Sequence, residues 1–187
     1  MAQHHPFEPT LAAAQRGDER AAERLYRAYQ PMLLRYLRSQ EHRAAEDLAA
    51  EVWLAAAKAL PDFQGDERGF RSWLFTVAKR RVIEHRRRGL RRRTDPVDPV
   101  TFTDTSHDED SAVRATDLVD AQRAVDLMVQ HLSADQAEVL ILRVVADLSA
   151  AQVAQLMQRP EAWVRITQHR ALKRLHAHLG TELEVLP

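Results

Sequence analysis

The stretch that decides the fold covers residues 45–88 and reads AEDLAAEVWLAAAKALPDFQGDERGFRSWLFTVAKRRVIEHRRR. Apolar residues recur at helical spacing up to Leu60, and Pro61 ends that helix. A short loop with two glycines follows. A further helix is predicted from about Phe70, where apolar residues at intervals of three and four form a core-facing stripe.

A run of arginines at the end of this stretch is the strongest electrostatic feature. Residues 79–93 contain nine Lys and Arg and a single acid, Glu84. Such a density of like charges favours a polyanionic partner, for example nucleic acid. A solvated, arginine-rich helix end is the alternative that this composition leaves open.

The overall charge of zero hides a division along the chain. Residues 1–93 carry a net charge of +7, residues 94–122 carry −7, and residues 123–187 are neutral. Residues 94–112 are rich in Pro, Ser, Thr and Asp, a composition that buries too little apolar surface to fold. We therefore expect two domains, 1–93 and 118–187, joined by a flexible acidic linker over 94–117.

The first domain is expected to contain two more helices before residue 45. Thr10 is predicted to cap a short helix over 11–16 that ends at Gly17. Asp18 is predicted to cap a helix that extends toward Gln40, with a kink or break at Pro31. The helix of the quoted stretch is expected to begin near residue 42.

The second domain ends in a helix-turn-helix pattern. Ser133 and Ser149 each precede a Gln by three residues, which is the signature of a capping box. A short helix from Ser149, a turn and a longer helix from Pro160 to about residue 179, ended by Gly180, give the pattern. Four apolar residues are expected to pack its inner side: Val153, Leu156, Val164 and Leu172.

Several classes of function find no support in the sequence. The chain has no cysteine, so disulfides and thiolate metal sites are excluded. It lacks a secretory signal and an apolar segment of about 20 residues, so no membrane insertion is expected. No phosphate-binding glycine loop or catalytic grouping is present. We expect no enzyme activity, no metal, no cofactor and no small-molecule substrate.

The chain resembles a known family in two places. Residues 45–88 resemble the second conserved domain of bacterial sigma factors of the extracytoplasmic-function (ECF) group within the sigma-70 family. Residues 132–175, LSADQAEVLILRVVADLSAAQVAQLMQRPEAWVRITQHRALKRL, resemble their fourth domain. The resemblance implies an all-α protein of two small helical domains joined by a flexible acidic linker, the C-terminal one a helix-turn-helix.

The same resemblance implies a function and partners. A protein of this kind is a transcription initiation factor that binds core RNA polymerase and recognises the −35 and −10 elements of promoter DNA. An anti-sigma factor is a further expected partner. The implied location is cytoplasmic, on the nucleoid when the protein is part of the holoenzyme. The alternatives are a stand-alone helix-turn-helix regulator of duplex DNA and, more remotely, a helical interaction module whose arginine run binds RNA.

The resemblance also assigns residues to three surfaces. The acidic helix is expected to dock on the polymerase clamp through Glu46, Asp47, Glu51 and Trp53. The loop and the basic helix are expected to capture the melted −10 strand and grip its phosphates through Gln64, Gly65, Asp66, Glu67, Arg68, Lys79, Arg80, Arg81, His85, Arg86, Arg87 and Arg88. The last helix and its surroundings are expected to bind the −35 duplex through Arg143, Arg165, Ile166, His169, Arg170 and Lys173.

The sequence departs from the family pattern at a few positions. Ala50 stands where the family usually has Gln in the acidic helix, and Gln158 replaces the usual turn Gly of the helix-turn-helix. Arg159 replaces a usual apolar turn residue. Trp163 and Ile166 stand in the last helix where small or polar residues are common.

Overall fold

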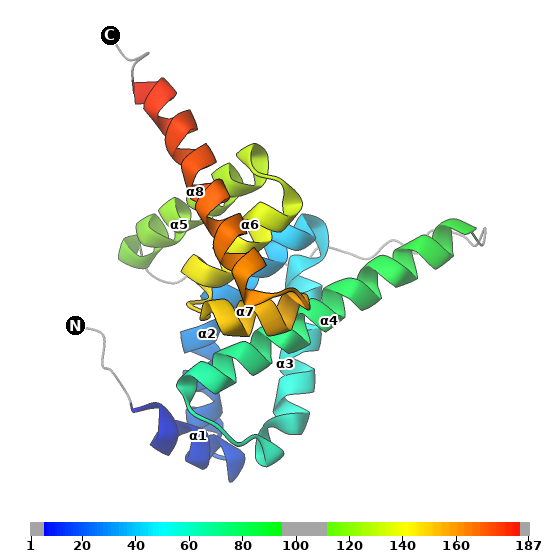
Figure 1. The fold of residues 1–187 in the computed structure, drawn as a ribbon. Helices are drawn as coiled ribbons and strands as arrows, with labels where there is room; N and C mark the ends of the chain where they lie inside the picture. Colours follow the sequence, from blue (N-terminus) through cyan, green and yellow to red (C-terminus); the bar gives the residue numbers. More distant parts are fainter. Residues whose placement is uncertain (1–5, 95–111, 184–187) are drawn as a thin grey trace.

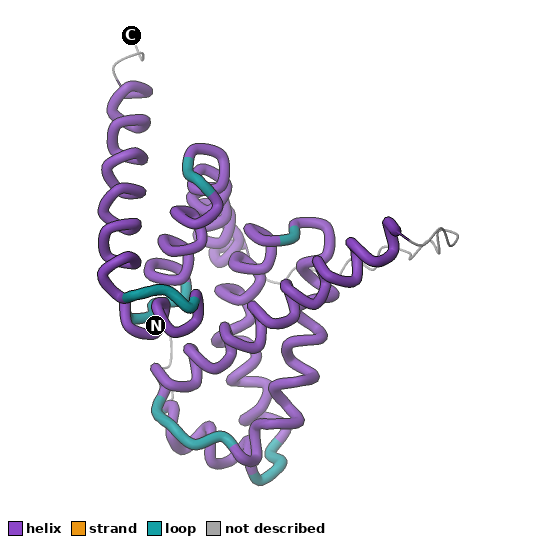
Figure 2. The backbone as a smooth tube through the Cα atoms, turned by 45° about the vertical axis from the view of Figure 1, so that its right-hand side comes forward, coloured by secondary structure: helices purple, strands orange, loops and turns teal. Residues whose placement is uncertain are grey.

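The computed structural model of the chain describes residues 6–94 and 112–183, with side chains for 6–91 and 122–178. Within those ranges every regular element is a helix, and short turns join the helices (Figures 1 and 2). The expected all-α fold is confirmed. Most of the acidic linker lies outside the described residues. Among the described helices none is both long and apolar enough to cross a bilayer.

The N-terminal half is a bundle of helices built around α2 (Glu19–Gln40). Helices α3 (Ala45–Ala59) and α4 (Glu67–Thr94) pack beside it, and α1 (Phe7–Gln15) packs against α2 (Figure 1). Short 3₁₀ turns, His42–Ala44 and Leu60–Asp62, flank α3. The fully buried side chains of this half include one from each of the three long helices: Leu33, Val52 and Phe75.

The C-terminal half consists of α5 (Ala112–His131), α6 (Ala134–Leu140), α7 (Ala150–Met157) and α8 (Glu161–Leu183). A π-helical segment, Ile141–Val145, continues α6. Both predicted capping boxes are present, since the Ser133 and Ser149 hydroxyls each accept from the main-chain N–H of the Gln three residues on, and each Ser main-chain N–H donates to the side-chain oxygen of that Gln. The helix-turn-helix is therefore formed by α7 and α8.

The two halves pack against each other. Helix α2 contacts both α5 and the π-helical segment, and α4 contacts α7. Their buried apolar side chains form a single cluster that includes residues of both halves. In this arrangement the α7–α8 unit lies against the side of the N-terminal bundle, and the C-terminal part of α4 projects away from it (Figure 1).

Three expected boundaries in the N-terminal half were wrong. Helix α1 begins at Phe7, so Thr10 lies inside it, and its hydroxyl donates to the Pro6 carbonyl oxygen at 3.0 Å. Of the kink or break expected at Pro31, the break is absent, because buried side chains before and after Pro31 anchor α2 to the core as one helix. Helix α4 begins at Glu67, because the Asp66 carboxylate accepts from the Gly69 N–H at 2.7 Å and caps it.

Two expectations for the last helix were also wrong. Helix α8 continues through Gly180 to Leu183 instead of ending near residue 179. Leu172 does not pack the inner side, since 48% of its surface is exposed. Ala171 fills the inner position with no exposed surface, and the next residue of a helix points about 100° away.

The turn between α7 and α8 contains a strained residue. Gln158 has a φ of +53° and caps α7 in the left-handed conformation. Glycine reaches that conformation at no steric cost, whereas other L-residues lose about 1–2 kcal/mol. The departure from the family pattern at this position therefore leaves the turn geometry intact and lowers stability.

Replacing Gln158 with Gly should raise the free energy of unfolding by about 0.5–1 kcal/mol, because the relief of strain exceeds the entropy that Gly adds to the unfolded chain. The matched control is Gln155→Gly, an exposed position inside α7, which should lower stability by about 1 kcal/mol. Urea unfolding followed by circular dichroism measures both. A loss of stability in Gln158→Gly equal to that of the control would contradict the assignment.

Candidate nucleic-acid interface

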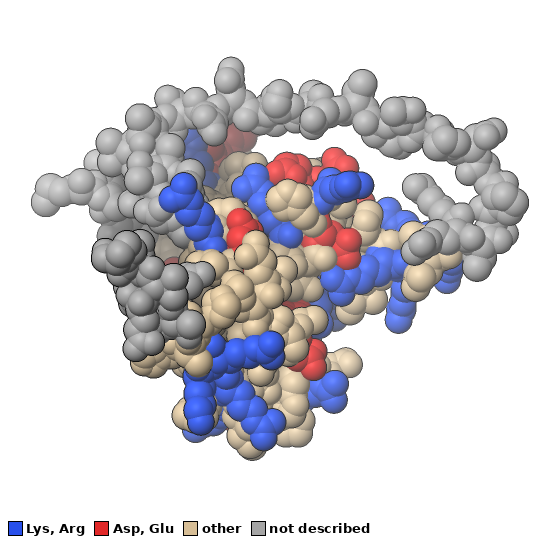
Figure 3. Space-filling model, turned by 90° about the horizontal axis from the view of Figure 1, so that it is seen from above, with Lys and Arg blue, Asp and Glu red and all other residues tan. Residues whose placement is uncertain are grey.

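The basic arm is the C-terminal part of α4, residues 79–91, whose cations line the helix where it leaves the bundle (Figure 3). Arg80 and Arg87 are exposed. Three other arginines pair with acids of the N-terminal half: Arg81 with Glu84 at 2.7 Å, Arg86 with Glu41 at 2.5 Å, and Arg88 with Glu51 at 3.2 Å. Because surface pairs contribute about 0–1 kcal/mol, a phosphate can replace such an acid at little cost.

His85 lies half-buried among these arginines. Lys79 has a different environment from the rest of the arm. Its Nζ lies 2.6 Å from Oε1 of Glu138, and both side chains are largely buried. The same oxygen accepts the Tyr36 hydroxyl at 3.1 Å. Burial, followed by the nearby Glu138 charge, raises the pKa of Tyr36 well above its usual value. Lys79 is thus part of the contact between the two halves.

The predicted strand-capture loop is held by local contacts. Its Gln64 side chain is exposed. Gly65 has a φ of +153°, and a Cβ there would lie 3.1 Å from the Phe63 ring, so a side chain at this position would be strained and crowd the ring. Asp66 caps α4, and Glu67 accepts the Tyr29 hydroxyl at 3.2 Å. Arg68 is exposed in the first turn of α4.

A polar hollow of about 340 Å³ opens beside this loop. It is lined by carboxylates, guanidinium groups and one aromatic ring: Phe7, Glu8, Asp66, Glu67, Arg68 and Arg71. The mixture of hydrogen-bond acceptors and donors is suited to the edge of an unpaired nucleobase.

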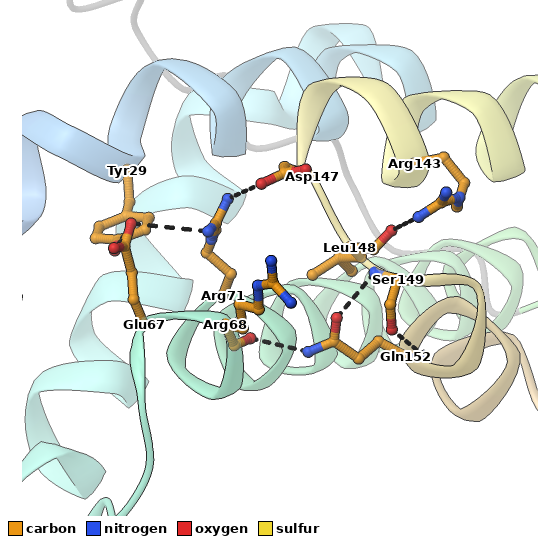
Figure 4. Close-up of polar contacts among 9 residues, drawn as sticks. All are labelled: Tyr29, Glu67, Arg68, Arg71, Arg143, Asp147, Leu148, Ser149 and Gln152. Atoms are coloured by element: carbon orange, nitrogen blue, oxygen red, sulfur yellow. Dashed lines mark hydrogen bonds and ion pairs between the residues drawn. The ribbon is translucent and has the colours of Figure 1, made fainter.

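The C-terminal half reaches this hollow at two points (Figure 4). The Arg71 guanidinium lies 2.5 Å from Asp147 and 3.8 Å from Glu67. Gln152, at the start of α7, donates its side-chain amide to the Arg68 carbonyl oxygen at 3.0 Å. The beginning of the helix-turn-helix therefore lies against the start of α4, beside the predicted strand-capture loop.

The predicted docking residues lie around the outer side of α3, with Trp53 at its edge toward α2 and Glu51 at its edge toward α4. Glu46 and Asp47 are exposed, and Glu51 and Trp53 are half-buried. The Trp53 indole N–H donates to Gln30 at 2.6 Å. Arg38 lies 2.8 Å from Glu46, and this hydrogen bond lowers the pKa of the Glu46 carboxyl.

Two further apolar residues on this surface were not predicted from the sequence. Tyr26 of α2 is 44% exposed and packs on Trp53 with 5.1 Å between ring centroids. Leu54 is 64% exposed. Its position seven residues after Asp47 places it on the acidic face, a signal that was present in the sequence. Exposed aromatic and aliphatic side chains ringed by charge are typical of a protein interface.

The outer face of α8 is open to solvent. The exposed residues include every predicted member from this helix: Arg165, Ile166, His169, Arg170 and Lys173. Arg165 pairs with Glu161 one turn before it, at 2.5 Å. The Arg159 guanidinium lies over the Trp163 ring, 5.3 Å from its centroid.

Arg143, the remaining candidate for the −35 surface, lies elsewhere. It is half-buried in the π-helical segment, and its guanidinium donates to Gln168 at 3.0 Å. The guanidinium also donates to the Leu148 carbonyl oxygen (Figure 4). These bonds join α6, α8 and the turn before α7. The structure therefore gives Arg143 a role inside the helix-turn-helix.

Replacing Glu138 with Ala should lower the free energy of unfolding by about 1–3 kcal/mol, because the buried Lys79 and Tyr36 groups lose their acceptor. Glu84→Ala removes an exposed acid from an i,i+3 pair and should change stability by less than about 0.5 kcal/mol. Chemical denaturation of both variants measures the difference. Equal, small effects would show that the Glu138 contact contributes nothing to the packing of the halves.

Comparison with known proteins gives matches in both halves. A family model described as Sigma-70 region 2 matches residues 25–93, and one described as Sigma-70, region 4 matches residues 122–175. An ECF RNA polymerase sigma factor of Mycobacterium tuberculosis, SigD, is 32% identical over 90% of this chain and 82% of its own length. ShbA, an ECF sigma factor of Streptomyces griseus, is 32% identical over 86% of this chain and 88% of its own.

Solved structures share the fold. The sigma factor RpoE of Bartonella quintana, solved with the anti-sigma factor NepR, matches 84% of this chain with a TM-score of 0.58 and 22% identity. CnrH, solved with the cytosolic domain of CnrY, matches 92% of this chain with a TM-score of 0.57 and 22% identity.

Proposed function

Since this chain belongs to the extracytoplasmic-function group of RNA polymerase sigma factors, we propose that its two halves divide promoter recognition between the surfaces described above. The protein is a transcription initiation factor that directs core RNA polymerase to promoters. We assign residues 1–93 to polymerase docking and the −10 element, 118–187 to the −35 element, and 94–117 to the connection. RNA synthesis is then the reaction of the polymerase, and this chain acts beside it in the cytoplasm.

The open face of α8 is the observation that carries the proposal. A recognition helix enters the major groove with the polar residues of one face. Arg165 and Arg170 are suited to guanine, which accepts two hydrogen bonds from one guanidinium, and Ile166 is suited to a thymine methyl. His169 and Lys173 lie on the same exposed face and extend it toward the sugar-phosphate backbone of the DNA. Because Arg143 is engaged internally, we do not assign it to DNA.

The basic arm and the loop before α4 form the proposed −10 surface. The exposed arginines of the arm supply phosphate contacts, which position the strand without reading its sequence. The hollow beside the loop takes up an unpaired base. Lys79 joins the basic surface only when its contact with Glu138 is broken.

The proposed polymerase-docking surface combines Glu46, Asp47, Glu51 and Trp53 with Tyr26 and Leu54. Its half-buried indole and exposed leucine supply apolar contact, and the carboxylates complement a basic partner. Because Glu51 also pairs with Arg88, docking at this face and phosphate binding by the arm compete for the same ion pair.

Promoter binding requires the two halves to separate. The two elements are centred roughly 25 base pairs apart, which is about 85 Å at a rise of about 3.4 Å per pair. A compact chain of 187 residues has a radius of gyration of only about 16 Å. The packed arrangement therefore cannot bind both elements at once. Core polymerase is the partner that holds the halves apart.

An anti-sigma factor is a second proposed partner. RpoE of Bartonella quintana, which shares this fold, was solved with the anti-sigma factor NepR. In this chain the docking surface on α3 and the outer face of α8 are both accessible in the packed arrangement. A protein that covers either of them would keep the factor from its targets.

Run-off transcription on a library of genomic fragments tests the function directly. Core polymerase with this protein should produce discrete transcripts from a few fragments, whereas core alone should not. Footprinting on those fragments should require core polymerase as well. Protection of duplex DNA by the protein alone, without core-dependent transcripts, would favour the stand-alone regulator.

Arg165→Ala and Arg170→Ala should each cost about 1–3 kcal/mol in promoter binding by the holoenzyme, and the loss should fall at particular −35 positions. Arg174→Ala, an exposed cation of α8 outside the proposed set, is the matched control and should cost less. Competition among −35 single-base variants measures the discrimination. Uniform weakening on every sequence would assign these arginines to phosphates.

A further inference from the structure

Helix α1 precedes the region matched to the sigma-70 family, yet it contacts the turn that leads into the proposed −10 loop. We propose that α1 is a working part of the −10 strand-capture site and that Gln15 is its positioning residue. This inference rests on the proposed role of the loop in capturing a base. Three observations support it.

The first observation is the pair of hydrogen bonds made by Gln15. Its side-chain Nε2 donates to the Leu60 carbonyl oxygen at 3.0 Å and to the Phe63 carbonyl oxygen at 2.7 Å. The two carbonyls lie at either side of the turn that follows α3. The Leu60 carbonyl oxygen also accepts from the Phe63 N–H at 3.1 Å, which closes the turn. One amide therefore bonds to both ends of this turn and fixes where the loop begins.

The second observation is the path from that turn to the loop. The Phe63 ring packs on Phe70 and Trp73, with centroids 5.5 and 5.2 Å away. Gly65 lies so close to the Phe63 ring that a Cβ would approach within 3.1 Å. Because the main chain at Gly65 lies against the Phe63 ring, a shift of the main chain at Phe63 displaces the loop.

The third observation is that α1 supplies part of the wall of the hollow. Phe7 and Glu8 line it together with residues of the loop and of the start of α4. The Phe7 ring is anchored on Phe70 at 5.5 Å and on Tyr29 at 6.5 Å. The hollow is thus incomplete without α1. The same helix fixes the position of the loop through Gln15 and forms a wall through Phe7 and Glu8.

The test compares holoenzymes that carry Gln15→Met, Gln15→Glu and Thr10→Val. The Met variant keeps the approximate length of the side chain and lacks both donors, and the Glu variant places a carboxylate against two carbonyl oxygens. Thr10→Val is the matched control, because it removes an α1 hydrogen bond to Pro6 without touching the loop. The readouts are promoter opening, followed by 2-aminopurine fluorescence in the −10 strand, discrimination among single-base −10 variants, and core binding.

We expect promoter opening to fall about tenfold in Gln15→Met, the size expected for two hydrogen bonds, and further in Gln15→Glu. Discrimination at −10 should fall with it, whereas −35 discrimination and core affinity should stay unchanged. Thr10→Val should open promoters at the wild-type rate. Thermal melting compares the stability of all three variants.

Wild-type opening and −10 discrimination in both Gln15 variants would overturn the inference. The inference would also be overturned if Thr10→Val lost promoter opening, −10 discrimination and core binding to the same extent as the Gln15 variants at an equal melting temperature. Such losses would indicate general destabilisation. If the wild-type holoenzyme opens no promoter at all, the proposed function itself fails, and this inference fails with it.

Discussion

One largely buried carboxylate joins the two halves. Glu138 of α6 accepts from the Tyr36 hydroxyl of α2 and the Lys79 ammonium of α4, in a place where little water reaches either group. Removing a charge from water is costly unless its partners are complete, and here both come from the other half. The contact therefore favours one relative placement of the halves over others. Arg71 with Asp147 and Gln152 with Arg68 extend it to the edge of the −10 loop.

This placement separates the functional surfaces into accessible and engaged groups. The outer face of α8 and the docking face of α3 are accessible, whereas Lys79, Arg68 and Arg71 contact the C-terminal half. In the proposed scheme the free protein can therefore dock on polymerase through α3 but cannot capture the −10 strand completely. Once the halves separate, Tyr36 and Lys79 lose their shared acceptor, and a phosphate or the polymerase must compensate Lys79.

Most of the fold could be predicted from the sequence, because helical periodicity and caps act locally. The capping boxes at Ser133 and Ser149 were identified correctly, as was the helix-turn-helix. The start of α4 was misplaced, since Asp66 is a cap whose signal resembles an ordinary polar loop. Long-range pairs left no local pattern. Nothing in the sequence placed Gln15 against the carbonyls of Leu60 and Phe63, or Lys79 and Arg143 in internal contacts.

Single-molecule energy transfer between the halves tests the central claim most directly, namely that the factor is packed when free and extended on its promoter. The chain has no cysteine, so Ala22→Cys in α2 and His176→Cys in α8, both exposed, give two labelling sites. The free protein should show one population with high transfer efficiency. In the holoenzyme on promoter DNA the labels should lie tens of ångströms further apart, toward the spacing of about 85 Å between the elements, and the efficiency should fall to near zero. An unchanged high efficiency in a transcribing complex would contradict the account.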